Sequence, residues 1–236
     1  MTVSTRPLPP RSAFVLILGM LVSAIAIYGF GHTVDERLIH FKTAPPPILY
    51  VHVAVSSAWL ALLVVQAALV RSRSVALHRR LGLWGLALGA VVCVVGYITV
   101  IVLRRADVAS GRGEEAVAFL AIPMLSLLMF AVPFSLAALW RKSSHRHRPL
   151  MVLATASLTA AAFVRFPGLN HEIQPFLTDG LMVAAAAWEW RLTRRLNPVY
   201  ALGIPIVFAS QVAAIWLITT APPAYMAVAH FLLRWT

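Results

Sequence analysis

Long apolar stretches separated by short basic loops fill most of the chain. Seven of them have about the length that crosses the hydrocarbon core of a bilayer, at residues 12–31, 48–70, 81–103, 117–140, 149–166, 173–190 and 199–219. Water is absent there, so each crossing segment must satisfy its own backbone hydrogen bonds as a helix. The pattern predicts an all-α fold, a polytopic transmembrane helical bundle that forms one membrane domain over residues 1–236. Residues 222–236 are too short to cross and are expected to lie along the interface.

Composition and charge agree with a membrane protein. Charged residues make up 12% of the chain, about half of their share in a soluble domain. The net charge of +12 would suggest a nucleic-acid partner in a soluble protein, but here Lys and Arg gather in loops on one side of the predicted bundle. That asymmetry is typical of membrane topology and of contact with lipid phosphates. It predicts a multi-pass membrane protein with a cytoplasmic N-terminus, the bilayer as its partner and no nucleic acid.

Familiar catalytic motifs are missing from the sequence. Cys93 is the only cysteine, so neither an internal disulfide nor a CxxC motif can form. The sequence also contains no Gly-rich phosphate loop, no HExxH and no nucleophile elbow. It therefore does not indicate an ordinary hydrolase, and it leaves open whether the protein is an enzyme.

Polar residues of three predicted spans and one loop fall near the outer side of the bundle. His52 and Ser56 share one helical face, which should point into the bundle because it carries polar groups through the membrane. Arg165 and Asp179 lie on neighbouring spans, and we expect them to pair. The predicted ligand-binding cluster consists of His52, Ser56, Arg165, His171 and Asp179. The alternative interpretation is a solvated loop above a structural ion pair.

Two histidines open predicted spans on the inner side. His78 lies beside a stripe of small residues at helical spacing, Gly82, Gly85, Gly89, Cys93 and Gly96. Such a stripe favours close helix packing over a slot for a flat cofactor. Paired imidazoles on different helices can nevertheless hold a haem, and the candidate pairs are His52 with His171 outside and His78 with His147 inside. The alternative is that these Arg-rich helix starts hold lipid phosphates.

The same motifs resemble a known family. The span with His52 and Gln66, the run from His78 to Gly82 (HRRLG) and the run from His147 to Met151 (HRPLM) leading to Arg165 resemble bacterial membrane proteins known as domain-of-unknown-function family 2306. The resemblance covers roughly residues 48–190, and it implies a polytopic inner-membrane protein without an established activity. The histidine layout is more distantly similar to di-haem b-type cytochromes, which implies haem b as a cofactor.

Three functions remain open from the sequence. The first is haem binding or membrane electron transfer with a redox partner, and it is our leading hypothesis. The second is a transporter or receptor for a small anionic or amphipathic ligand, anchored by Arg165 with His52, Ser56 and Asp179 around it. The third is a non-catalytic membrane subunit or assembly factor, for which the small-residue stripe would be a docking surface.

Overall fold

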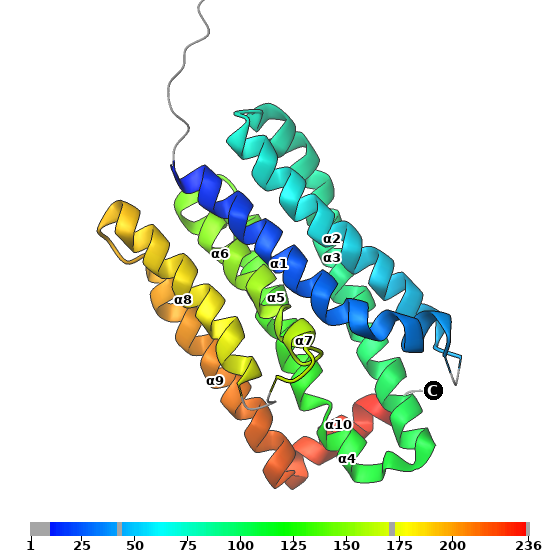
Figure 1. Cartoon of the computed structure of the whole chain (residues 1–236). Coiled ribbons are helices and arrows are strands. Elements are labelled where there is room, and N and C mark those ends of the chain that lie inside the picture. Colours follow the sequence, from blue (N-terminus) through cyan, green and yellow to red (C-terminus); the bar gives the residue numbers. More distant parts are fainter. Residues whose placement is uncertain (1–9, 42–43, 170–172, 235–236) are drawn as a thin grey trace, which may run out of the picture.

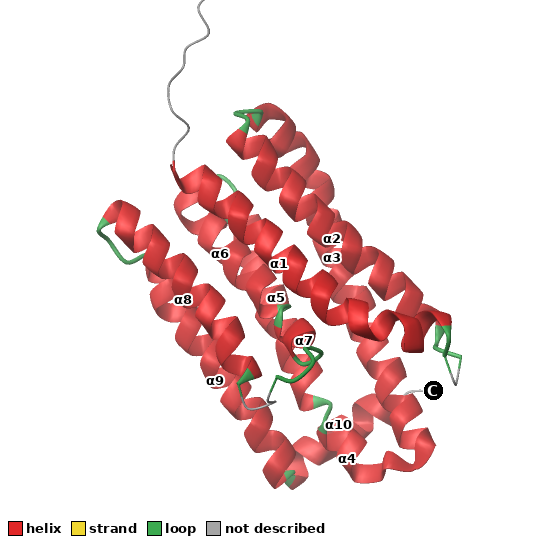
Figure 2. Cartoon of the chain, viewed as in Figure 1, coloured by secondary structure: helices red, strands yellow, loops and turns green. Residues whose placement is uncertain are grey.

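The computed structural model describes residues 10–41, 44–169 and 173–234. All described residues belong to helices and connecting loops, without a strand among them (Figure 2). The elements are α1 (Pro10–Val34), η1 (Asp35–Ile39), α2 (Pro47–Arg71), α3 (Val75–Asp107), η2 (Val108–Arg112), α4 (Gly113–Ala118), α5 (Ala121–Leu139), α6 (Ser144–Ser157), α7 (Ala160–Phe163), α8 (Gln174–Thr193), α9 (Pro198–Thr220) and α10 (Pro223–Arg234). The all-α prediction is confirmed.

The long helices run side by side as a bundle (Figure 1). α2 packs against α3, α5 against α6, and α8 against α9. The loops at 72–74, 140–143 and 194–197 lie at one end of the bundle, which we call the Arg148 end. The opposite end, where α4 and α10 lie, is called the Arg165 end. Each polar cluster described below belongs to one of these two ends or to the helix interfaces between them.

Within the described residues, five helical segments are long and apolar enough to cross a membrane: Ala13–Ile39, Pro47–Arg71, Val75–Ala118, Ala121–Leu139 and Pro198–Thr220. They are consistent with an integral membrane protein. The predicted spans at 149–166 and 173–190 are not among them. α6 has only 14 residues and α7 adds 4, while α8 contains Asp179, Glu189 and Arg191. The seven-span count and the orientation of the N-terminus therefore remain predictions.

An aromatic cluster fills the centre of the bundle beside α3. Trp59 of α2 meets Phe130 and Phe134 of α5 edge to face, at ring-centroid distances of 5.3 and 5.5 Å. The ring of Phe134 lies so close to Gly89 that an added Cβ would stand 2.2 Å from it. Leu62 and Leu127 approach Gly85 and Gly96 in the same way, each at 3.1 Å from the added atom. The small-residue stripe is thus a helix-packing surface, as the sequence favoured.

The contact between α1 and α7 fixes the position of Arg165. A Cβ on Gly29 of α1 would stand 2.4 Å from the carbonyl oxygen of Ala162, so only glycine allows the two backbones to approach this closely. The next residue of α1, Phe30, places its ring 4.5 Å from the Arg165 guanidinium carbon. The close packing of α1 against α7 therefore sets where Phe30 and Arg165 lie relative to each other.

The C-terminal segment forms α10, which crosses the Arg165 end of the bundle (Figure 1). The Tyr225 hydroxyl donates to the Ala118 carbonyl at 2.8 Å, and His230 Nε2 lies 3.0 Å from a Glu114 carboxylate oxygen. Arg105 of α3 donates from Nε to the Leu233 carbonyl at 2.9 Å. The tail is therefore a helix bonded to α3 and α4, a more ordered arrangement than an interfacial tail alone.

The close approach at Gly29 predicts that Gly29→Ala lowers the free energy of unfolding by about 1–3 kcal/mol, the usual cost of overpacking. Gly31→Ala is the matched control, because a Cβ there meets nothing within 4 Å and only the higher helix propensity of alanine acts. Thermal midpoints of the two variants in one detergent make the comparison. Equal midpoints would contradict the α1–α7 contact.

Candidate functional site

Arg165 and His52 come together at the Arg165 end. His52 lies in the second turn of α2, and Arg165 follows α7 directly. Arg165 donates to the carbonyl of Ala161 and stacks over Phe30. Its charge is close enough to act on His52, and the charge of Arg37 in η1 acts on Arg165 in turn. Among the described residues, no carboxylate lies within ion-pair distance of Arg165.

His52 contributes an unpartnered polar atom to this site. Its side chain is half-buried, and Nδ1 is inaccessible and lacks a hydrogen-bond partner within the described chain. Ser56 lies one turn further along the same face of α2 and is also half-buried. A buried ring nitrogen without a partner carries a desolvation cost unless a water or a ligand bonds to it. The site therefore presents a guanidinium and an imidazole with unused hydrogen-bonding capacity.

Two members of the predicted outer cluster are not found with Arg165. Asp179 of α8 accepts a hydrogen bond from Gln211 Nε2 of α9 at 3.2 Å, so the expected Arg165–Asp179 ion pair does not form. His171 lies outside the described residues, as do its neighbours Asn170 and Glu172. Sequence reasoning missed Gln211, although a lone amide in an otherwise apolar span is itself a signal of a buried polar contact.

A second cluster at the Arg148 end joins the other two histidines. With the Gln66 amide oriented to satisfy its neighbours, its nitrogen donates to His78 Nδ1 at 2.6 Å and its oxygen accepts from the Gly82 amide at 2.9 Å. His147 donates from Nδ1 to the Ala137 carbonyl at 2.9 Å. His147 also has an electrostatic effect on His78, so the two imidazoles belong to the same end of the bundle. Four helices thus bring together residues that lie far apart in the sequence.

The tautomers in this cluster follow from the bonds. A carbonyl can only accept, so neutral His147 carries its proton on Nδ1 and leaves Nε2 as an acceptor. His78 accepts at Nδ1 from the amide, so its proton is on Nε2. The free Nε2 of His78 is therefore a donor, and the free Nε2 of His147 is an acceptor. To bind iron through Nε2, His78 would have to carry its proton on Nδ1 instead. Its Nδ1 could then donate to the Gln66 amide oxygen, after the amide rotates by half a turn.

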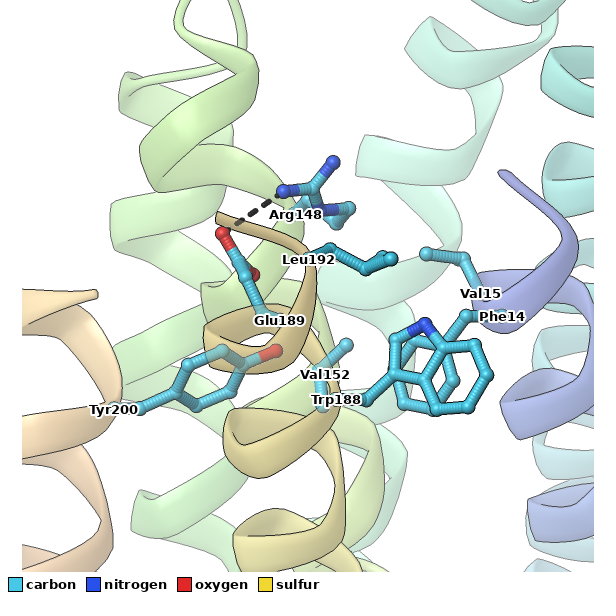
Figure 3. Close-up of a pocket in the computed structure, with 8 residues that line it drawn as sticks. All are labelled: Phe14, Val15, Arg148, Val152, Trp188, Glu189, Leu192 and Tyr200. Carbon is cyan, nitrogen blue, oxygen red and sulfur yellow. Dashed lines mark hydrogen bonds and ion pairs between the residues drawn. The ribbon is translucent and has the colours of Figure 1, made fainter. Parts of the chain in front are cut away.

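A third polar cluster, which sequence reasoning missed, ties α6, α8 and α9 together. Arg148 and Glu189 form an ion pair at 3.0 Å beside a small pocket, into which Tyr200 points its hydroxyl (Figure 3). Asn197 caps α9 by accepting from the Val199 amide, and it donates to Glu189 at 3.3 Å. The signal in the sequence was that Glu189 is the only acidic residue at a predominantly basic end of the predicted bundle.

Comparisons with known proteins do not assign this chain to a group. No protein-family model, no curated protein and no solved structure matches it. The similarity to the uncharacterised family therefore stays a prediction. The part of the chain that the structure describes also contains no group of three or more His, Cys, Asp or Glu side chains that could hold a metal ion. The assignment of a function has to come from the clusters themselves.

The Arg148–Glu189 pair gives a stability prediction. Glu189 is almost fully buried, so Glu189→Met leaves Arg148 without its partner and is expected to cost about 3 kcal/mol, the lower end for a buried pair because the Arg148 side chain is 25% exposed. Arg148→Met should cost a similar amount. The double variant should cost less than the sum by about 0.5–3 kcal/mol, because no unpaired charge remains. Thermal midpoints of the three variants test this coupling, and strictly additive losses would contradict it.

Proposed function

We propose that this integral membrane protein is a receptor or transporter that binds a small anionic or amphipathic molecule at the Arg165 end. The observation that carries the proposal is the Arg165 guanidinium, which has no carboxylate partner among the described residues. A charge inside a membrane bundle without a counter-ion is costly, and ionisable residues there usually pair or mark a ligand site. A bound anion would supply the counter-charge that the described residues do not provide.

The surroundings of Arg165 support this ligand class. The Arg165 charge acts on the His52 imidazole, and the Arg37 charge acts on Arg165 in turn. Carboxylates and phosphates accept the paired N–H donors of a guanidinium particularly well. The rings of Phe30 and Phe166 lie beside the site, with Tyr28 in edge-to-face contact with Phe166 at 4.8 Å. An amphipathic anion could therefore place its apolar part against these rings.

The side of the membrane follows from the charge asymmetry. Most basic loops are at the Arg148 end, and loops rich in Lys and Arg stay in the cytoplasm. We accordingly propose that the protein lies in a bacterial inner membrane with its Arg165 end facing outward. The ligand would then reach the site from the outer side.

The proposal predicts that anions stabilise the purified protein through Arg165. Octanoate and inorganic phosphate serve as probes, and octanol serves as an uncharged control. A probe at one hundred times its dissociation constant should add about 2.7 kcal/mol to the unfolding free energy, measured as a rise in thermal midpoint. Arg165→Gln should abolish this rise.

Arg112→Gln is the matched control, because Arg112 is an exposed arginine near the same end whose charge is already paired with Asp107 at 3.3 Å. It should leave the anion-induced rise unchanged. If Arg165→Gln responds to both probes as the unmodified protein does, Arg165 is not the anchor and the proposal fails.

A second candidate, haem b at His78 and His147, is favoured by one observation. His147 donates from Nδ1 to the Ala137 carbonyl, which is how proteins orient histidine ligands, and His78 would do the same toward Gln66 after its amide rotates. Bound haem would supply one-electron chemistry, and Arg79 next to His78 would be available to its propionates. The outer pair, His52 with His171, adds no support because His171 lies outside the described residues.

A visible absorption spectrum tests this second candidate. After haem-supplemented expression, the purified protein should show a Soret band that His147→Ala removes. His145→Ala, two residues away in the same helix turn, should keep the band. A protein without a Soret band, or a band that survives His147→Ala, would exclude haem at this pair.

A further inference from the structure

A carboxyl and an amide are paired between α8 and α9, apart from the anion site and the histidines. Asp179 is 9% exposed, and its Oδ1 accepts from Gln211 Nε2 at 3.2 Å. Asp179 lies in the second turn of α8, about 8 Å along the axis from the first residue of that helix. Neither the proposed anion site nor the haem candidate uses this pair.

Both side chains keep one oxygen without a partner. Asp179 Oδ2 and Gln211 Oε1 are buried, and neither has a hydrogen bond within the described residues. Rotating the amide would not help, because it would turn Oε1 toward the carboxylate oxygen that Nε2 now bonds. An ionised carboxylate has no hydrogen to donate, so it cannot satisfy the amide oxygen. With Asp179 ionised, its Oδ2 and the Gln211 Oε1 each lack a hydrogen bond.

No charge compensates Asp179 in the described part of the bundle. The elements packed against α8 are α1, α6, α7 and α9. Arg148 on α6 is paired with Glu189, and Arg165 after α7 faces Phe30 and His52. Among the described residues, Gln211 on α9 is the side chain that bonds Asp179, and it is neutral. The preceding residue of α8, Thr178, bonds Thr159 at 3.3 Å and is also neutral.

We propose that Asp179 is a proton-binding site in which the neutral acid and Gln211 form two hydrogen bonds. A proton taken from water onto Oδ2 turns that atom into a donor to Gln211 Oε1, so both unpartnered oxygens are satisfied at once. The bond from Nε2 to Oδ1 is kept. Removing the proton leaves a buried carboxylate with one neutral donor, a costly state in the interior of a membrane protein.

A metal cation fits the same atoms less well. Hard cations take several oxygen ligands, whereas this pair offers two free oxygens. The Gln211 amide N–H₂, bonded to the same carboxyl, also carries positive partial charge and would repel a cation beside it. A proton needs no further ligand. A proton is therefore the occupant that fits these atoms. Binding of Na⁺ at Asp179 would contradict this assignment.

Infrared spectroscopy of the purified protein at neutral pH tests the proposal directly. A protonated carboxyl has a carbonyl stretch above the amide I band, and the chain has only eight Asp and Glu residues to contribute. The unmodified protein should show such a band, and Asp179→Asn should lose it. Asp35→Asn is the matched control, because Asp35 is an exposed carboxyl of the same type, and it should keep the band.

A second variant keeps the test decisive if Asp179→Asn does not fold. Gln211→Leu retains Asp179 but removes both of its amide contacts, so the band should move to higher frequency. Thermal midpoints in NaCl and in choline chloride complete the experiment, and we expect them to agree. Absence of the band, its survival in Asp179→Asn, or stabilisation by NaCl that Asp179→Asn abolishes would overturn the proposal.

Discussion

The hydrocarbon core of a bilayer supplies no hydrogen-bond partners, so every polar group that enters the bundle must find one in the chain or bind one from outside. Several buried and half-buried polar contacts meet this constraint. Arg148 pairs with Glu189, Gln66 bonds His78, and Asn197 caps α9 while it contacts Glu189. The same constraint makes the exceptions informative, because a buried polar group without a partner among the described residues is a candidate position for a bound water, ion or ligand.

Three of the buried polar atoms that lack a partner among the described residues lie at two interfaces of the bundle, and the other two, Trp59 Nε1 and Thr155 Oγ1, lie elsewhere. Arg165 and His52 form the first, where α1, α2 and α7 meet, and there a positive charge lacks its counter-ion among the described residues. Asp179 and Gln211 form the second, between α8 and α9, and there two acceptors lack a donor. The anion proposed for the first interface would supply the counter-charge, and the proton proposed for the second would supply the donor.

Much of this arrangement follows from the sequence. Hydropathy predicts the helices, and the spacing of glycines in α3 predicts a packing face that Leu62, Phe134 and Leu127 occupy. The partners of polar side chains were harder to predict. Arg165 and Asp179 are on neighbouring spans, yet Asp179 turns to Gln211, because periodicity gives the face of one helix and not which helix lies opposite. The fifth and sixth spans were also uncertain, since α6 ends early and α8 carries charges.

The outward-facing anion site that we propose requires the two ends of the bundle to face opposite sides of the membrane. Ser110 in η2 and Ser144 at the start of α6 are both exposed, one at each end. Each can be changed to cysteine in a background in which Cys93, the only native cysteine, is replaced by serine. Labelling of intact cells with a membrane-impermeant maleimide should modify the Ser110 position and spare the Ser144 position. Equal labelling of both positions would contradict the account.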